Sequence, residues 1–166
     1  KPMKTPAPLP PFCSRVVPVV VVTDPAQAVP MAEALLAGGI DVIEITLRSA
    51  AGLAAIEAVA RAVPAMQVGA GTVTRASEVA QVVSAGARFA LSPGSTPALI
   101  EAVLQAGLPF IPGVGSPSEA MAMRDAGFGL MKCFPAAQLG GVEVLKAWGG
   151  PLPDLRFCPT GGVSLA

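Results

Sequence analysis

Short apolar runs rich in β-branched residues recur along this chain at similar intervals. Seven such runs alternate with segments rich in alanine and leucine, at a period of roughly 20–27 residues. The runs cover residues 15–22, 41–47, 66–70, 88–92, 108–113, 129–134 and 155–160. Strands that alternate with helices at this spacing indicate parallel βα units. The repeat therefore predicts an α/β fold, either an open doubly wound sheet or a (β/α)8 TIM barrel.

The segments between the runs carry the start and stop signals of helices. Asp24, Thr96 and Ser116 each precede a proline, which predicts a capping side chain followed by proline at the first helical position. Gly107 and Gly127 lie where the helices that begin after Thr96 and Ser116 should end. We expect six or seven helices between the strands.

Side-chain alternation in the second run favours the barrel. The odd-numbered positions from 43 to 47 are aliphatic, whereas the even-numbered positions become more polar from Val42 through Glu44 and Thr46 to Arg48. Because side chains alternate across a strand, one face packs under helices and the other carries polar groups to the carboxyl end. Barrel active sites lie at that end. In addition, no GxGxxG motif follows the first run, which weakens the dinucleotide-binding alternative.

Two regions are expected from these patterns. Residues 1–14 form a proline-rich tail, which we expect to be extended and mobile, and residues 15–166 form the barrel. No eighth strand follows the run at 155–160, so the barrel is expected to be truncated after its seventh strand, with two unpaired edges.

Composition excludes several classes of function. The chain has no histidine, which excludes Ser–His triads and histidine-ligated zinc. Eleven basic residues balance eleven acidic ones, so a nucleic-acid surface is not expected. The apolar runs are too short to cross a membrane. Three cysteines without a CxxC pair predict free thiols and a cytoplasmic location.

Lys132 is the only lysine that falls within a predicted strand. Its neighbours are apolar, and Leu130 and Phe134 should share its face. One interpretation is a strand lysine whose stem packs and whose ammonium reaches water. The other is a lysine on the inner barrel face, where burial disfavours the charged form and leaves a neutral amine that attacks ketones. We favour the second, which predicts a Schiff-base nucleophile.

Glu44 is the only acid in the middle of a predicted strand. Schiff-base chemistry needs a proton carrier, and a carboxylic acid in an apolar interior can fill that role. The alternative interpretation is that Glu44 is only a buried ion-pair partner of a cation. Arg48 is predicted on the same face. Its guanidinium group can bind a substrate carboxylate, or it is simply a solvated charge at the rim of the barrel. The turn of Thr160, Gly161 and Gly162 follows the seventh strand, where barrels tend to bind phosphate.

Taken together, the motifs GGIDVIEITLRS, VGAGTV, ALSPG, FIPGV, MKCFPA and RFCPTGGVS resemble a known family in order and spacing. That family is the class I 2-keto-3-deoxy-6-phosphogluconate (KDPG) and 4-hydroxy-2-oxoglutarate (KHG) aldolases. The resemblance extends from the first run to the last residue. It implies a metal-free TIM barrel that assembles as a homotrimer and acts on a small phosphorylated 2-keto acid.

The resemblance also implies roles for individual residues. Lys132 matches the Schiff-base lysine and Glu44 the general acid/base, while Arg48 matches the arginine that contacts the carboxylate. Further matches are Thr72, Pro93, Phe134 and Thr160 for substrate binding, and Gly161 and Gly162 for one half of a phosphate site. The family's second phosphate loop follows its eighth strand and has no counterpart before Ala166.

The expected activity is cleavage of 2-keto-3-deoxy-6-phosphogluconate to pyruvate and glyceraldehyde 3-phosphate, with 4-hydroxy-2-oxoglutarate as a second substrate. Three alternatives stay open. One is a 2-keto-3-deoxy-6-phosphogalactonate aldolase, and another is a catalytically idle barrel fragment that acts as an oligomeric scaffold. The third, a different phosphate-binding barrel, accounts for PTGG but not for EITLR together with MKCFPA.

Overall fold

A computed structural model describes residues 4–164 of the chain. Its strands are β1 (Val19–Val20), β2 (Val42–Thr46), β3 (Gln67–Gly71), β4 (Phe89–Leu91), β5 (Phe110–Ile111), β6 (Gly113–Val114), β7 (Leu130–Cys133) and β8 (Arg156–Pro159). A 3₁₀ turn, η1 (Pro25–Gln27), leads into α1 (Ala28–Ala37). The other helices are α2 (Gly52–Ala62), α3 (Ala76–Ser84), α4 (Pro97–Ala106), α5 (Pro117–Asp125), α6 (Ala136–Leu139) and α7 (Gly141–Gly149).

All seven predicted strand runs contain strand, and every pairing is parallel. One sheet has the order β1-β2-β3-β4-β5 and the other the order β6-β7-β8. The run predicted at 108–113 is divided: β5 pairs with β4 and β6 pairs with β7, with Pro112 between them. Proline has no N–H to donate, but its carbonyl still accepts from the Lys132 N–H at 2.9 Å. The two sheets are therefore joined at Pro112.

The first predicted run is shortened, because regular strand is limited to β1. Val19 and Val20 pair with Glu44 and Ile45, and Pro18 contributes only its carbonyl, which accepts from the Glu44 N–H at 2.9 Å. Among the described residues, β1 pairs with no strand other than β2. The first strand thus covers only residues 19–20 of the predicted run 15–22, and it is paired on one side.

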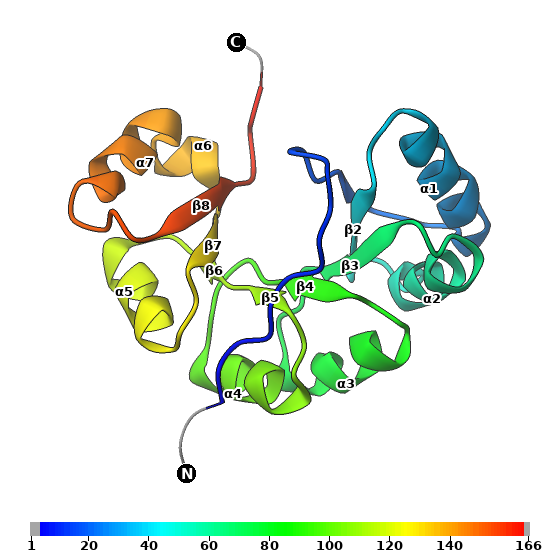
Figure 1. Ribbon diagram of the computed structural model, residues 1–166, viewed down its shortest axis with the longest axis horizontal. Coiled ribbons are helices and arrows are strands. Elements are labelled where there is room, and N and C mark those ends of the chain that lie inside the picture. The colour runs from blue at the N-terminus through cyan, green and yellow to red at the C-terminus, as the bar shows by residue number, and fades with distance from the viewer. Residues whose placement is uncertain (1–3, 165–166) are drawn as a thin grey trace.

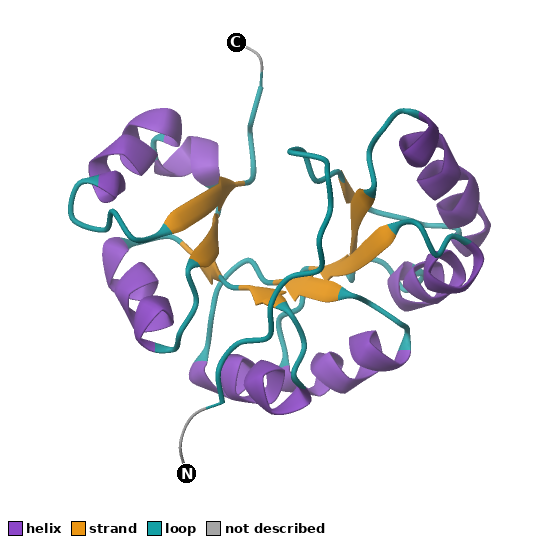
Figure 2. Ribbon diagram, in the orientation of Figure 1, coloured by secondary structure: helices purple, strands orange, loops and turns teal. Residues whose placement is uncertain are grey.

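The strands form the inner layer of an arc, and the helices lie outside it (Figures 1 and 2). β1 and β8 are the end strands of the two sheets, and the arc is open between them. The barrel predicted from the alternation in β2 is confirmed in this open form. The capping predictions at Thr96 and Ser116 are also confirmed, since each side chain accepts an N–H bond at the start of its helix.

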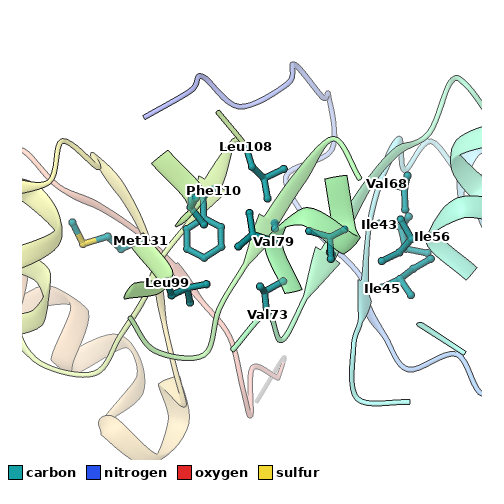
Figure 3. Packing of buried hydrophobic residues seen from close by; sticks show 14 of the residues in the cluster. Ile43, Ile45, Ile56, Val68, Val73, Val79, Leu99, Leu108, Phe110 and Met131 are labelled. Atoms are coloured by element: carbon teal, nitrogen blue, oxygen red, sulfur yellow. The ribbon is translucent and has the colours of Figure 1, made fainter. Parts of the chain in front are cut away.

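The main hydrophobic core fills the layer between strands and helices. Ile43 and Ile45 of β2 are fully buried there, together with Val68 of β3 and Met131 of β7 (Figure 3). Complete burial of an aliphatic side chain of this size contributes about 1.5–3 kcal/mol to stability. The odd-numbered face of β2 therefore packs under helices, as predicted, which leaves its even-numbered face for the interior.

A second, smaller hydrophobic cluster is formed by residues of β2, β4 and β5. Val42, Phe89, Leu91 and Ile111 are buried together, and Leu9, Phe12, Val17 and Leu130 pack against them. Residues 4–14, predicted to be an extended and mobile tail, have no helix or strand and contact the rest of the fold. Phe12 stacks on Phe89 with ring centroids 6.2 Å apart, and the Asp41 carboxylate accepts the N–H bonds of Cys13 and Ser14 at 2.7 and 2.9 Å.

Within residues 4–164, no helix is both long enough and apolar enough to cross a membrane.

Candidate active site

Lys132 lies in the middle strand of the three-stranded sheet and points into the interior. In β7 its neighbours in register are Gly113 of β6 and Cys158 of β8. Only 4% of the residue is exposed. Its Nζ lies 5.4 Å from the centroid of the Phe134 ring, whose negative face favours a cation. The lysine is therefore buried on the inner face, as predicted, and does not extend to water.

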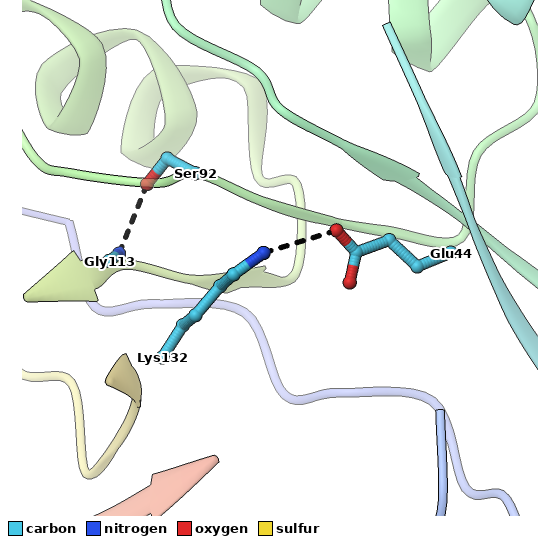
Figure 4. Close-up of polar contacts among 4 residues, drawn as sticks. All are labelled: Glu44, Ser92, Gly113 and Lys132. Carbon is cyan, nitrogen blue, oxygen red and sulfur yellow. Dashed lines mark hydrogen bonds and ion pairs between the residues drawn. The ribbon is translucent and has the colours of Figure 1, made fainter. Parts of the chain in front are cut away.

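Glu44 reaches Lys132 from the opposite sheet. The Lys132 Nζ donates to the Glu44 Oε1 at 3.3 Å, and Glu44 is 1% exposed (Figure 4). Burial raises the pKa of Glu44, and the Lys132 charge and its hydrogen bond oppose that rise. The protonated acid is therefore more accessible at Glu44 than at an exposed carboxyl group. An amine and a carboxyl group at this distance can exchange one proton.

Two glycines of β3 make room for the large side chains in the interior. A Cβ atom at Gly71 would lie 2.6 Å from the Glu44 Cγ and 2.8 Å from its carboxyl carbon. A Cβ atom at Gly69 would overlap the ring of Phe89. Side-chain contacts this short do not occur, so residues with a β-carbon at these positions would displace Glu44 or Phe89.

A cavity of about 810 Å³ surrounds the Lys132–Glu44 pair. All nine residues that the sequence singled out line this one cavity: Glu44, Arg48, Thr72, Pro93, Lys132, Phe134, Thr160, Gly161 and Gly162. Glu44 and Lys132 lie within β2 and β7, and the others follow the carboxyl ends of strands, where barrel active sites lie. The structure brings these residues together, and their individual roles stay predictions.

Thr72 stands out in the backbone of this site. Its φ angle of 57° makes it the one non-glycine residue with positive φ among the described residues. A β-branched residue rarely adopts this conformation, and such outliers cluster at functional sites. Thr72 directly follows β3 and Gly71, so the unusual backbone lies at the carboxyl end of a strand that lines the cavity.

Pro93 is held in place by hydrogen bonds on both sides. The Gly113 N–H donates to the Ser92 Oγ at 3.1 Å, and the Ser95 Oγ donates to the Gly113 carbonyl at 2.8 Å (Figure 4 shows the first). Because Gly113 pairs with Lys132, this network fixes the loop that carries Pro93 relative to the lysine strand.

The loop after β8 is bound to the segment that follows Lys132. The carbonyls of Thr160 and Gly161 accept the N–H bonds of Ala136 and Ala137 at 2.8 and 3.0 Å. Gly161 and Gly162 have φ angles of 96° and 72°, a backbone that favours glycine. A fixed glycine turn at a strand end is suited to binding an anion through peptide N–H groups.

The cavity is also lined by residues that the sequence did not assign to the site, among them Arg15, Thr46 and Cys158. Thr46 could have been found, because it shares the strand face of Glu44, whereas Cys158 is identified only by its pairing in register with Lys132. Arg15 precedes the first strand and carried no such signal. Burial raises the pKa of the Cys158 thiol, so this residue favours the protonated form.

All three cysteines are free, as predicted. Between residues 4 and 164, no group of three or more histidine, cysteine, aspartate or glutamate side chains gathers in a way that could hold a metal ion.

Comparison with models of protein families shows which family the chain belongs to. The family described as "Aldolase: KDPG and KHG aldolase" matches residues 13–166, almost the whole sequence. The chain belongs to this family. The resemblance in the motifs around Glu44 and Lys132 is thereby confirmed.

Curated members of the KDPG and KHG aldolase family are similar over most of this chain. The 2-dehydro-3-deoxy-phosphogluconate aldolase of Pseudoalteromonas atlantica is 53% identical over 149 residues, which cover 90% of this chain and 69% of the relative. The KHG/KDPG aldolase of Escherichia coli K12 is 50% identical over 151 residues, which cover 91% of this chain and 71% of the relative.

Solved KDPG aldolases share the fold. The Legionella pneumophila enzyme, with pyruvate captured at low pH as a covalent carbinolamine, is 46% identical with a TM-score of 0.86 over 89% of this chain and 71% of that one. The Zymomonas mobilis ZM4 enzyme with 3-phosphoglycerate is 41% identical with a TM-score of 0.86, over 89% and 70%.

Proposed function

We propose that this chain is a class I aldolase that cleaves 2-keto-3-deoxy-6-phosphogluconate through a Schiff base on Lys132. The observation that carries this proposal is the buried pair of Lys132 and Glu44, 3.3 Å apart within the cavity. A nucleophilic amine beside a carboxyl group of raised pKa is the arrangement that imine formation and hydrolysis require.

The first half of the reaction forms the imine. Proton transfer from Lys132 to Glu44 leaves a neutral amine, which attacks the C2 ketone and forms a carbinolamine. Glu44 then donates its proton to the departing hydroxyl group, so water leaves and a protonated imine remains. The relative from Legionella pneumophila holds pyruvate as a covalent carbinolamine, which is the adduct of this step.

The second half breaks the carbon–carbon bond. The Glu44 carboxylate accepts the proton of the C4 hydroxyl, the C3–C4 electron pair moves toward the imine, and glyceraldehyde 3-phosphate leaves. Glu44 returns the proton to C3 of the resulting enamine. Water then attacks C2 of the imine, and pyruvate and free Lys132 are released. Each proton that Glu44 takes is given back, so the residue ends the cycle unchanged.

The remaining cavity residues orient the substrate in this proposal. The Arg48 guanidinium and Thr160 orient the carboxylate, while Thr72, Pro93 and Phe134 line the pocket around the carbon chain. The turn of Gly161 and Gly162 binds the phosphate. The support is that all of these residues line one cavity with the reacting pair.

The test is aldol cleavage by the purified chain, measured as pyruvate released from 2-keto-3-deoxy-6-phosphogluconate. We expect turnover by the wild type and none above background for Lys132→Met. Lys146→Met is the matched control, because Lys146 is exposed and pairs only with Glu143 on its own helix. A wild-type chain that is folded but has no turnover would contradict the proposal and favour the idle scaffold.

The same assay compares substrates. Cleavage of 2-keto-3-deoxy-6-phosphogalactonate in preference to the gluconate epimer would assign the alternative aldolase, and turnover of 4-hydroxy-2-oxoglutarate would establish the second activity.

The chain acts in this proposal without a cofactor, in the cytoplasm. Light scattering tests the proposed homotrimer, for which we expect three times the chain mass of 16.6 kDa.

A further inference from the structure

Thr46 is a buried polar residue whose hydroxyl lacks a partner. It is the last residue of β2, only 1% of it is exposed, and it lines the cavity. Among the described residues, its Oγ1 has no hydrogen-bond partner. Buried hydroxyl groups are normally paired, because an unpaired one costs free energy. This hydroxyl therefore calls for a partner from outside the chain.

The position of Thr46 identifies the part of a ligand that it faces. Glu44 and Thr46 lie on the same face of β2, and residues two apart along a strand are separated by about 7 Å. Glu44 contacts the Lys132 Nζ, and Arg48 follows Thr46 in the turn after β2, where it is exposed and lines the same cavity. Thr46 thus lies between the reacting amine and the arginine.

A 2-keto acid attached to Lys132 through C2 has its carboxylate one bond away. To reach Arg48, that carboxylate must extend from Lys132 along β2, past Thr46. We infer that the Thr46 hydroxyl donates a hydrogen bond to the C1 carboxylate of the bound 2-keto acid. Thr46 is then a carboxylate-binding residue in addition to Arg48 and Thr160. This inference rests on the proposed function, because it takes Lys132 as the attachment point.

The inference predicts opposite effects on binding and on stability when the hydroxyl is removed. Thr46→Val keeps the shape and replaces the hydroxyl by a methyl group. A hydrogen bond to a charged group is lost in the complex, which should raise the half-saturating pyruvate concentration by about 10- to 100-fold. In the free protein an unpaired buried hydroxyl is removed, so the melting temperature should rise by about 2–4 °C.

The experiment measures pyruvate-dependent reduction by borohydride, followed by intact mass. The extent of adduct formation is recorded against pyruvate concentration for the wild type, Thr46→Val, Thr46→Ser and Thr74→Val. Thr46→Ser keeps the hydroxyl and should stay within about threefold of the wild type. Thr74→Val is the matched control, since Thr74 is exposed and does not line the cavity. Melting temperatures of all four are measured without ligand.

The expected result is weakened pyruvate binding by Thr46→Val alone, together with an equal or higher melting temperature. Unchanged half-saturation in Thr46→Val would overturn the inference and leave the proposed function intact. A lower melting temperature in Thr46→Val would also overturn it, because the hydroxyl would then have a structural partner. Failure of the wild type to form any adduct would overturn the proposed function, and this inference with it.

Discussion

At the scale of the residue, the proposed chemistry depends on one amine and one carboxyl group that are both buried. Lys132 and Glu44 are 4% and 1% exposed, and each is the other's only charged contact in the described interior. Their separation in sequence is 88 residues, so only the folded chain brings them together. A buried pair of this kind is expensive to desolvate and is weak evidence for stability, which favours a functional reason for it.

The proposed proton carrier, Glu44, can be removed with almost no change in shape. Glu44→Gln keeps the side-chain volume but has no exchangeable carboxyl proton. We expect the turnover number for aldol cleavage to fall by about 10²- to 10⁴-fold. Steady-state kinetics of cleavage measures this, and Glu33→Gln on the exposed side of α1 is the control. Turnover within a few-fold of the wild type in Glu44→Gln would show that another group carries the proton.

Gly71 provides a second test of the geometry around Glu44. In Gly71→Ala the new methyl group would overlap the Glu44 side chain and push it away from Lys132. Because a displacement of about 1 Å at a reacting group can cost about 10²-fold in rate, we expect a loss of that order. Gly149→Ala is the control, since nothing lies near its added methyl group. Equal activity of the two variants would mean that Glu44 tolerates displacement.

At the scale of the element, the sequence predicted which strands exist better than where they end. The alternation in residues 42–48 correctly separated the packed face from the cavity face, because a strand with helices on one side has a strict period of two. The split at Pro112 and the short β1 were missed, since pairing partners decide strand ends and a single strand's pattern does not contain them. The need for glycine at position 71 was missed for the same reason: it depends on a side chain of β2.

The packed N-terminal segment was also missed, because prolines predict an extended backbone and say nothing of what it contacts. Its anchor is Asp41, whose carboxylate accepts the N–H bonds of Cys13 and Ser14; these bonds lower the pKa of Asp41 below its ordinary 3.8. For a lowered carboxyl pKa, the contribution to stability is complete above 3.8 and is lost as the pH falls through the lower folded value.

Asp41→Asn should therefore melt at a lower temperature than the wild type near neutral pH, and the difference should shrink as the solution becomes more acidic than pH 3.8. Thermal unfolding at a series of pH values measures both effects. Asp125→Asn, at an exposed position of α5, is the control and should show no such convergence. A difference between Asp41→Asn and the wild type that stays constant with pH would rule out the carboxylate as the anchor.

At the scale of the whole molecule, the site exists only because two sheets curve toward each other. β2 supplies Glu44 from one sheet and β7 supplies Lys132 from the other, and the cavity lies between them. Sequence reasoning reached the nine cavity residues because family motifs mark them, and it left Thr46 unassigned because no motif role singles it out. The chain spans about 70% of the length of its curated relatives. Whether this chain forms a working active site is best tested by the reaction of Lys132.

The most direct measurement is borohydride reduction of the folded chain in the presence of pyruvate, followed by peptide mapping. Reduction of the imine leaves a 1-carboxyethyl group on the lysine that formed it. The account predicts this group on the peptide that contains Lys132, only when pyruvate is present, and none on the peptide that contains the exposed Lys146. A folded chain in which Lys132 stays unmodified, or is modified no more than Lys146, would contradict the account.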